Sequence, residues 1–183
     1  MIYTYQYHSP LGEITLAANG EALTGLWFDG QKYYGDTLPK QVEVRKLPVF
    51  EQTERWLDTY FQGKAPDFIP PLSWDTTPFR KAVWEILLSI PYGQTMTYGE
   101  IAHRIAKQNG LSKMSAQAVG GAVGHNPISI IVPCHRVVGT NGSLTGYAGG
   151  IDKKRKLLAL ERVNISEMSI LKKGTALSNL KIS

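Results

Sequence analysis

A proline-rich stretch divides this chain into two parts with different residue patterns. Pro66, Pro70 and Pro71 lie too close together for a helix or a central strand to pass through them. Before this stretch, alternating apolar segments flank Asn19-Gly20, a strong β-hairpin signal, and apolar residues recur at helical spacing over 49–61. After it, short helical patterns predominate. The sequence therefore predicts an α+β protein of two domains joined by a linker.

The length of 183 residues accommodates this division. We predict an N-terminal domain over residues 1–72, a C-terminal domain over 76–165 and a loose tail over 166–183. No apolar run approaches the roughly 18–20 residues that cross a membrane, and no basic region followed by an apolar core opens the chain. A lone cysteine excludes an internal disulfide. We expect a cytoplasmic monomer that is not bound to a membrane.

Charge is distributed unevenly between the two parts. Residues 1–75 carry 6 lysines and arginines against 10 aspartates and glutamates, whereas residues 76–183 carry 14 against 5. A basic domain of this kind is typical of a protein that meets a polyanion, most often nucleic acid. A solubility bias gives the same pattern, and charge alone does not choose between the two interpretations.

The only cysteine, Cys134, lies between two β-branched apolar runs within residues 130–138. This pattern predicts that its thiol lies in or beside a packed core, with His135 as its immediate neighbour. A thiol is a strong nucleophile only as thiolate, and a proton-accepting neighbour is a common way to form one. A buried structural cysteine fits the same spacing.

Two short helices are predicted ahead of this segment. Thr97 and Glu100 fit a capping box for the first, and Tyr98 lies on its inward face. The second begins near Ser115 and runs to Gly124. Two short helices joined by a turn and followed by a strand-like segment suggest a helix-turn-helix DNA reader, although the pattern is weak by itself.

Glycine dominates the outer face of the second of these helices. Gln117, Gly120, Gly121 and Gly124 share that face, and each glycine costs about 1 kcal/mol relative to alanine within a helix. A smooth face of this kind lets a bulky partner approach the backbone. A duplex groove qualifies, and close packing of another helix is the alternative.

A last helix is predicted over residues 151–162. Glu161 shares a face with Leu157 and Leu158, so its carboxylate points toward the core, where it needs a partner. His135 is the obvious candidate. A solvated glutamate at a frayed helix end is the alternative. The basic run over residues 153–156 is interpreted as a solvated helix face.

Several ordered motifs of residues 77–162 resemble the O6-alkylguanine-DNA alkyltransferases, the methylated-DNA–protein-cysteine methyltransferases. The matching motifs are Val119 to Ala122, Asn126-Pro127, Ile131 to Gly139, Gly146 to Gly150 and Leu157 to Glu161. The resemblance implies a small ribonuclease-H-like domain of sheet and helix, followed by a mostly helical winged helix-turn-helix domain. The first part resembles the family only in its order of elements.

The resemblance also implies a chemistry. The alkyl group of O6-alkylguanine, and of O4-alkylthymine, would pass to Cys134 once per protein molecule. His135 would take the thiol proton through a water, and Glu161 would orient the imidazole, as in a catalytic triad. Tyr98 would protonate the departing guanine. Asn126 would link the helix-turn-helix to the active-site segment.

The resemblance further implies a minor-groove complex, without sequence specificity, in which the damaged nucleotide is rotated out of the duplex. The positions implied to contact DNA or the base are Gln117, Ala118, Gly120, Gly121, Arg136, Val137, Tyr147, Ala148 and Gly149. Gln117 stands where the family has an arginine that fills the gap in the stack. We therefore predict weaker or slower nucleotide rotation, or compensation by Lys113 or Arg136.

No metal or cofactor is expected. The N-terminal half has no cysteine and only His8, so it cannot build the zinc site of some family members. Three other functions are considered. A non-catalytic binder of alkylated DNA would lack Cys134, a sequence-reading regulator would need base-edge readers on a recognition helix, and a cysteine hydrolase would need an oxyanion hole.

Overall fold

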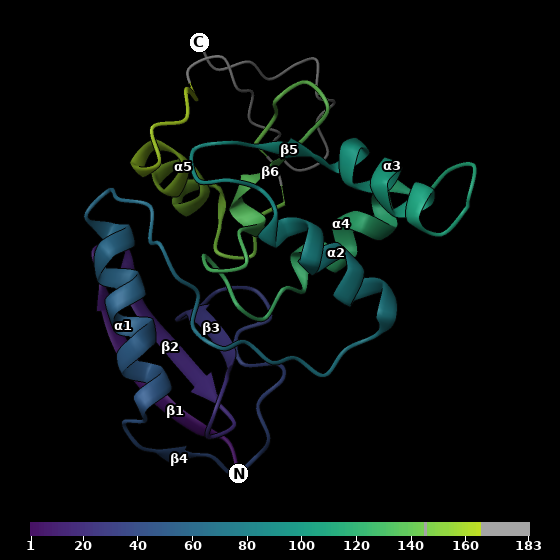
Figure 1. Cartoon of the computed structure of the whole chain (residues 1–183). Coiled ribbons are helices and arrows are strands. Elements are labelled where there is room, and N and C mark those ends of the chain that lie inside the picture. The colour runs from purple at the N-terminus through teal and green to yellow at the C-terminus, as the bar shows by residue number, and fades with distance from the viewer. Residues whose placement is uncertain (145, 166–183) are drawn as a thin grey trace. The chain divides into compact units, whose positions relative to one another are not determined.

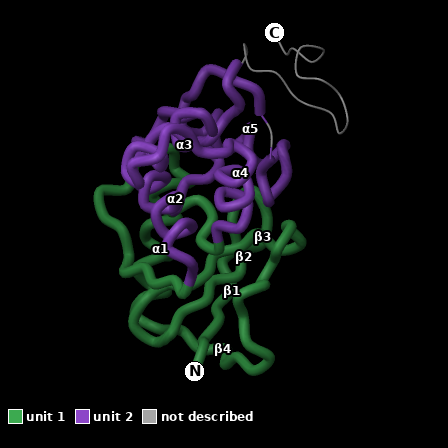
Figure 2. The backbone as a smooth tube through the Cα atoms, turned by 90° about the vertical axis from the view of Figure 1, so that its right-hand side faces the viewer, with its two compact units in different colours: residues 1–75, 127–131 green, residues 76–126, 132–183 purple. Residues whose placement is uncertain are grey.

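The computed structural model describes residues 1–144 and 146–165. They form two compact units, one of residues 1–75 with 127–131 and one of residues 76–126 with 132 onward (Figure 2). The first unit is a sheet with one long helix, and the second is mostly helical, so the predicted α+β class is confirmed. The predicted tail lies outside the described residues. No helix in the described part is long and apolar enough to cross a membrane.

The sheet of the first unit has the strand order β3-β2-β1-β4. Its strands are β1 (Tyr3–Ser9), β2 (Gly12–Ala18), β3 (Leu23–Phe28) and the short β4 (Glu43–Val44). The pairs β1–β2 and β2–β3 are antiparallel, and β4 runs parallel to β1. Asn19-Gly20 forms the predicted turn between β2 and β3: the Asn19 side chain accepts backbone hydrogen bonds, and Gly20 takes a φ of +109°.

Helix α1 (Pro48–Phe61) packs against β1 and β2 (Figure 1). Its contacts are largely aromatic, because Phe50 stacks on Tyr5 and Phe61 on Tyr7. The Tyr7 hydroxyl also donates to Asp58 at 2.6 Å. The helix ends near Gly63, where the sequence predicts its end.

Two distant segments cover the outer edge of β3. Residues 71–73 pair with Leu23, and residues 127–129 pair with Leu26 through hydrogen bonds of 2.8 and 3.0 Å. An exposed strand edge is a template for pairing with other chains, and these segments occupy it. Residues 127–131 therefore group with the first unit, although the sequence analysis leaves them within the C-terminal range.

The second unit contains a cluster of three helices, a two-stranded parallel ladder and a last helix. Its elements are α2 (Pro78–Leu88), β5 (Met96–Thr97), α3 (Tyr98–Gln108), α4 (Ala116–Gly124), a 3-10 turn (Cys134–Arg136), β6 (Val137–Val138) and α5 (Ile151–Leu160). Helices α2, α3 and α4 contact one another, and the Trp84 indole donates to the Ala122 carbonyl at 2.8 Å.

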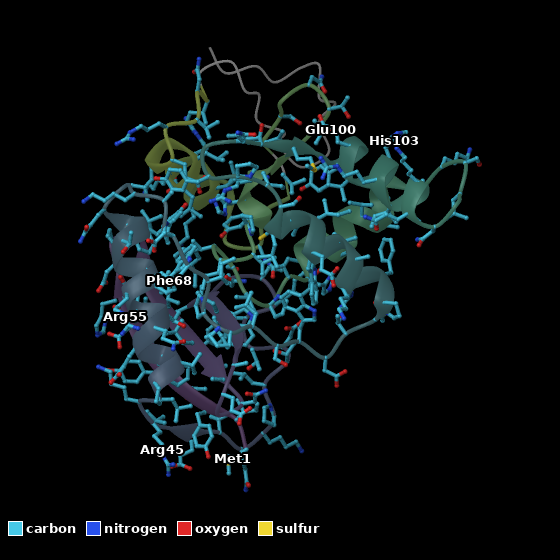
Figure 3. All side chains as sticks on the ribbon, viewed as in Figure 1. Met1, Arg45, Arg55, Phe68, Glu100 and His103 are labelled. Atoms are coloured by element: carbon cyan, nitrogen blue, oxygen red, sulfur yellow. The ribbon has the colours of Figure 1, made fainter. Side chains whose placement is uncertain are left out.

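Helices α3 and α4 form the predicted pair of short helices. Each begins at a hydroxyl side chain: Thr97 accepts from the Glu100 N–H, and Ser115 from the Ala118 N–H. Figure 3 shows Glu100 and His103 on the outer side of α3, where both are exposed. Within the described ranges, no cluster of histidine, cysteine and carboxylate side chains is arranged to hold a metal ion.

Candidate active site

Cys134 opens the 3-10 turn and is 5% exposed. Its N–H donates to the Val132 carbonyl at 2.8 Å, and the buried Asn126 side chain donates to the same oxygen at 2.8 Å. Asn126 follows helix α4, so it ties the end of that helix to the segment that presents the cysteine. Burial raises the pKa of the Cys134 thiol, while a hydrogen bond with Asn126 and the charge of Lys154 oppose this rise. The resting cysteine is therefore a thiol that needs a base.

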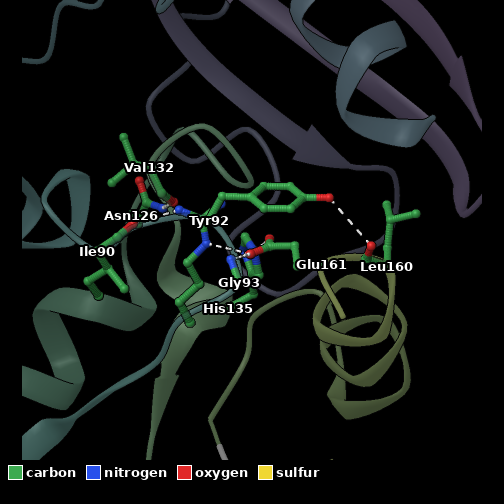
Figure 4. A network of polar contacts seen from close by, with 9 residues as sticks. Ile90, Tyr92, Gly93, Asn126, Val132, His135, Leu160 and Glu161 are labelled. Atoms are coloured by element: carbon green, nitrogen blue, oxygen red, sulfur yellow. Dashed lines mark hydrogen bonds and ion pairs between the residues drawn. The ribbon is translucent and has the colours of Figure 1, made fainter. Parts of the chain in front are cut away.

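His135 and Glu161 form a hydrogen-bonded pair in the core. The His135 Nε2 to Glu161 Oε2 distance is 2.6 Å, and both side chains are fully buried (Figure 4). Burial alone would raise the pKa of Glu161, but hydrogen bonds and charges of His135 and Arg136 lower it to about 2. The predicted inward placement of Glu161 thus brings it to the predicted partner.

This pair fixes which imidazole nitrogen can act as a base. An ionised carboxylate only accepts hydrogen bonds, so Nε2 of His135 carries the hydrogen and Nδ1 is the accepting nitrogen. Burial lowers the pKa of His135, an effect that Glu161 opposes. The ring is accordingly neutral at physiological pH and able to take a proton.

Arg136 belongs to this buried network rather than to the surface. Its Nε donates to Glu161 Oε1 at 2.8 Å, and a terminal nitrogen donates to the Ile90 carbonyl at 2.7 Å. The Gly93 N–H adds a hydrogen bond of 3.0 Å to the same Glu161 oxygen (Figure 4). The Arg136 side chain is only 9% exposed and is bound to the carboxylate that holds His135. Its expected contact with DNA stays a prediction.

Tyr98, the first residue of α3, lies between two glycines of the second unit. A Cβ atom on Gly146 would come within 3.1 Å of the Tyr98 hydroxyl, and one on Gly120 within 3.9 Å of the ring. Burial and the charge of Cys134 raise the pKa of Tyr98 to about 12. The hydroxyl therefore stays protonated at neutral pH, close enough to Cys134 for their charges to interact.

Among the predicted pocket residues, Val137 and Tyr147 lie near the turn. Val137 follows it directly in β6, and the buried Tyr147 ring lies edge-on to His135 with a centroid distance of 6.4 Å. Ala148 and Gly149 are half-buried in the same loop as Tyr147. The Val137 carbonyl accepts a hydrogen bond from Lys154.

Lys154 is a residue that the sequence analysis misses. The basic run around it predicts a solvated helix face, but the structure buries Lys154 completely. The available signal is its spacing: position 154 stands three and four residues before Leu157 and Leu158, on the inward face of α5. A lysine stem packs like an aliphatic side chain, which makes the position compatible with the core.

The outer face of α4 is open, as its glycines suggest. Gln117, Ala118 and Gly121 are exposed, and Gly120 is half-buried. Apart from the backbone of α4 and the residues adjacent in the chain, no heavy atom of the described residues lies within 4 Å of a Cβ built on Gly121 or Gly124. Packing inside the protein therefore does not require glycine at either position.

Comparisons with known proteins identify the family. The sequence model described as the 6-O-methylguanine DNA methyltransferase DNA-binding domain matches residues 78–163, and that of the same family's ribonuclease-like domain matches residues 1–74. Methylated-DNA–protein-cysteine methyltransferases are 42% identical over 164 residues in Haemophilus influenzae (89% of this chain, 87% of that protein) and 45% over 163 residues in Mycobacterium tuberculosis (88% and 93%).

Solved structures give the same answer. The crystal structure of Mycobacterium tuberculosis OGT in complex with DNA superposes with a TM-score of 0.76 at 43% identity, covering 87% of this chain and 92% of that one. The two matching domains, in the same order, confirm both the resemblance and the predicted ribonuclease-like and helical DNA-binding domains. The chain therefore belongs to the 6-O-methylguanine DNA methyltransferase family.

Proposed function

We propose that this protein repairs DNA by moving the alkyl group of O6-alkylguanine, and of O4-alkylthymine, onto its own Cys134. The observation that carries the proposal is the buried thiol beside a neutral imidazole whose other nitrogen is fixed by an ionised carboxylate. A soft thiolate suits an unactivated carbon electrophile, and a thioether has no easy return path. Each molecule would therefore act once.

The proposed transfer is a single displacement. A bond forms between Sγ of Cys134 and the alkyl carbon as the bond from that carbon to O6 breaks. Nδ1 of His135 takes the thiol proton through a water, and Glu161 stabilises the imidazolium. Tyr98 gives a proton to the departing guanine. The Tyr98 oxygen then regains a proton from the protonated His135 through solvent. The net change moves one proton from sulfur to guanine.

The outer face of α4 is the proposed DNA surface. A thiol that is 5% exposed is out of reach of a stacked base, so the damaged nucleotide must rotate out of the duplex. The minor groove is only about 6 Å wide, and a helix face that consists mostly of glycine and alanine is slim enough to approach its floor. Such a face carries few groups that read base edges, which fits binding without sequence preference.

The remaining parts of the proposal concern assembly and location. Every side chain proposed for the chemistry comes from the second unit of a single chain, which supports a monomer. A protein consumed through its only thiol needs a reducing compartment, which supports a cytoplasmic location.

Replacing Gly121 with alanine should separate folding from DNA binding. We expect the variant to be more stable by about 0.5–1 kcal/mol, because alanine is the better helix former and its methyl group meets no protein atom outside its own helix. We expect duplex affinity to fall roughly tenfold, because the methyl group holds the backbone away from DNA. Urea unfolding and fluorescence anisotropy with a labelled duplex measure the two effects.

Gly99→Ala is the matched control, since Gly99 is exposed on α3, where an added Cβ makes an ordinary contact with Thr97. It should gain stability without losing affinity. Full affinity in Gly121→Ala would place the DNA surface elsewhere.

Intact mass spectrometry tests the proposed activity directly. After incubation with a duplex that contains O6-methylguanine, we expect a mass gain of one methylene unit, limited to one equivalent, and no gain in Cys134→Ser. Nuclease digestion of the DNA should recover unmodified guanine. Binding without any mass gain, on single and double strands, would instead indicate a damage-recognition or regulatory protein.

A further inference from the structure

The connection between α3 and α4 has no task in the proposed displacement. Every residue from 107 to 113 is exposed, and Figure 1 shows this connection projecting away from the helices of the second unit. It contains two lysines, Lys107 and Lys113, and between them Leu111, which is 49% exposed. An exposed leucine flanked by two cations is an unusual surface for a segment without a partner.

The start of this connection is an ordered helix end. Gly110 takes a φ of +66°, and its N–H donates to the Lys107 carbonyl at 3.3 Å. The Leu111 N–H donates to the Ala106 carbonyl at 2.8 Å. These two hydrogen bonds are those of a Schellman motif, in which a helix ends at a glycine of positive φ. The motif fixes the direction in which Leu111 leaves α3, so its exposure belongs to a defined turn.

Positive charge in this part of the chain is not balanced locally. Residues 101–151 contain four lysines and arginines and no aspartate or glutamate. The exposed Lys156 of α5 pairs with Asp152 at 3.1 Å. Among the described residues, no carboxylate lies within ion-pair distance of Lys107 or Lys113. Exposed cations without a local counter-charge favour a polyanionic partner.

The place of these charges in the chain puts them beside the proposed DNA surface. Ser115 caps α4, and the exposed Gln117 and Ala118 follow in its first turn. With that face on the floor of the minor groove, the chain before Ser115 must cross one of the two rows of phosphates that line the groove. Lys113 stands four residues before Gln117, a separation that spans at most about 14 Å. The groove is about 6 Å wide, so its phosphates are within reach of Lys113.

We propose that residues 107–113 are a second DNA-contacting element, in which Lys107 and Lys113 bind phosphates beside the groove and Leu111 packs against its sugar edges. This inference rests on the proposed function, because it takes α4 as the DNA surface. A duplex supplies both kinds of contact, since it carries about one negative charge per 1.7 Å of its length and minor-groove proteins commonly place leucine against it. Contacts to phosphate and sugar carry no sequence information, which fits binding without sequence preference.

The salt dependence of DNA binding tests the two lysines. Fluorescence anisotropy with a labelled, undamaged duplex gives Kd at several salt concentrations, and each phosphate contact contributes about 0.9 to the slope of log Kd against log salt. In the double variant Lys107→Gln, Lys113→Gln we expect this slope to fall by about two. Binding should weaken roughly tenfold at low salt, and the difference from wild type should vanish toward about 1 M salt.

The double variant Lys40→Gln, Lys64→Gln is the matched control. It removes the same charge from two exposed positions of the first unit, so the slope should not change. Urea unfolding verifies that all variants are folded.

Leu111→Ser tests the apolar contact separately. We expect duplex affinity to fall about fivefold, because serine offers little apolar area to bury against the sugars. The salt slope should stay at the wild-type value, because no charge is removed.

An unchanged slope in the folded variant of Lys107 and Lys113, an equal loss in the control, or full affinity in Leu111→Ser would overturn the proposal. Failure of the proposed function gives a different result: wild type would transfer no methyl group, while the lysine variant would still lose slope. Methyl transfer by wild type together with equal slopes would instead reject this DNA contact and leave the proposed function standing.

Discussion

Replacing Glu161 with glutamine should slow methyl transfer by between about 10² and 10⁴-fold and destabilise the protein by about 3 kcal/mol. Three hydrogen-bond donors of the described chain meet at this carboxylate: His135 Nε2, Arg136 Nε and the Gly93 N–H. A glutamine side chain has only one accepting oxygen. Whichever way its amide lies, a donor faces a donor.

Either orientation of the amide has a distinct consequence. If the NH₂ group faces His135, the imidazole must accept through Nε2, so its hydrogen moves to Nδ1 and the base is lost. If the NH₂ group faces Arg136, a buried guanidinium loses its counter-charge. The first outcome acts mainly on the rate and the second mainly on stability.

Rapid-quench measurement of methyl transfer and urea unfolding distinguish the two. Glu85→Gln is the matched control, because Glu85 is exposed on α2 and its replacement should change neither quantity. A folded Glu161→Gln protein that transfers methyl groups at the wild-type rate would remove Glu161 and the orientation of His135 from the mechanism.

The stability difference between wild type and Glu161→Gln should depend on pH. The pKa of Glu161 is about 2 in the folded protein against an ordinary value of 4.5. A group whose pKa is depressed by folding contributes fully above its unfolded pKa, and that contribution is lost as pH falls toward the folded pKa. The difference should thus be constant above about pH 5 and shrink on acidification, because the glutamine does not titrate.

Local patterns are sufficient to predict that the proposed reacting groups lie together. Cys134 and His135 are adjacent in an apolar run, and helical spacing alone turns Glu161 inward, so their meeting needs only that α5 packs on the turn. The capping residues Thr97 and Ser115 likewise act within their own helices, and both fall where the sequence predicts. These are contacts whose geometry is set by a few neighbouring residues.

Local patterns do not predict the environments of Arg136 and Lys154. Both have long side chains, and the polar ends of these reach partners that the sequence does not specify: Glu161 and the Ile90 carbonyl for Arg136, and the Val137 carbonyl for Lys154. Lys154 stands in a basic run, where charged residues are usually solvated, so for this residue the pattern favours the wrong environment. The pairing of residues 127–129 with β3 is equally unpredictable, since it joins segments about a hundred residues apart.

Replacing Tyr98 with phenylalanine should slow methyl transfer roughly a hundredfold and leave duplex affinity and stability nearly unchanged. With a pKa of about 12, the hydroxyl holds its proton at neutral pH and can give it up only to a group that becomes strongly basic. Guanine O6 becomes such a group as the bond to the alkyl carbon breaks. The ring of phenylalanine fills the same space between Gly120 and Gly146, so packing should be preserved.

The leaving group provides the decisive comparison for Tyr98. A guanine made more acidic by an electron-withdrawing substituent needs less help from a proton donor, so the rate difference between wild type and Tyr98→Phe should shrink with such substrates. Tyr92→Phe is the matched control, because the Tyr92 hydroxyl makes a long hydrogen bond of 3.4 Å to the Leu160 carbonyl and has no part in the proposed displacement. A rate loss in Tyr98→Phe that is the same for every leaving group would mean that the hydroxyl orients the flipped base rather than protonating it. The same loss in Tyr92→Phe would mean that neither hydroxyl acts on the reaction itself.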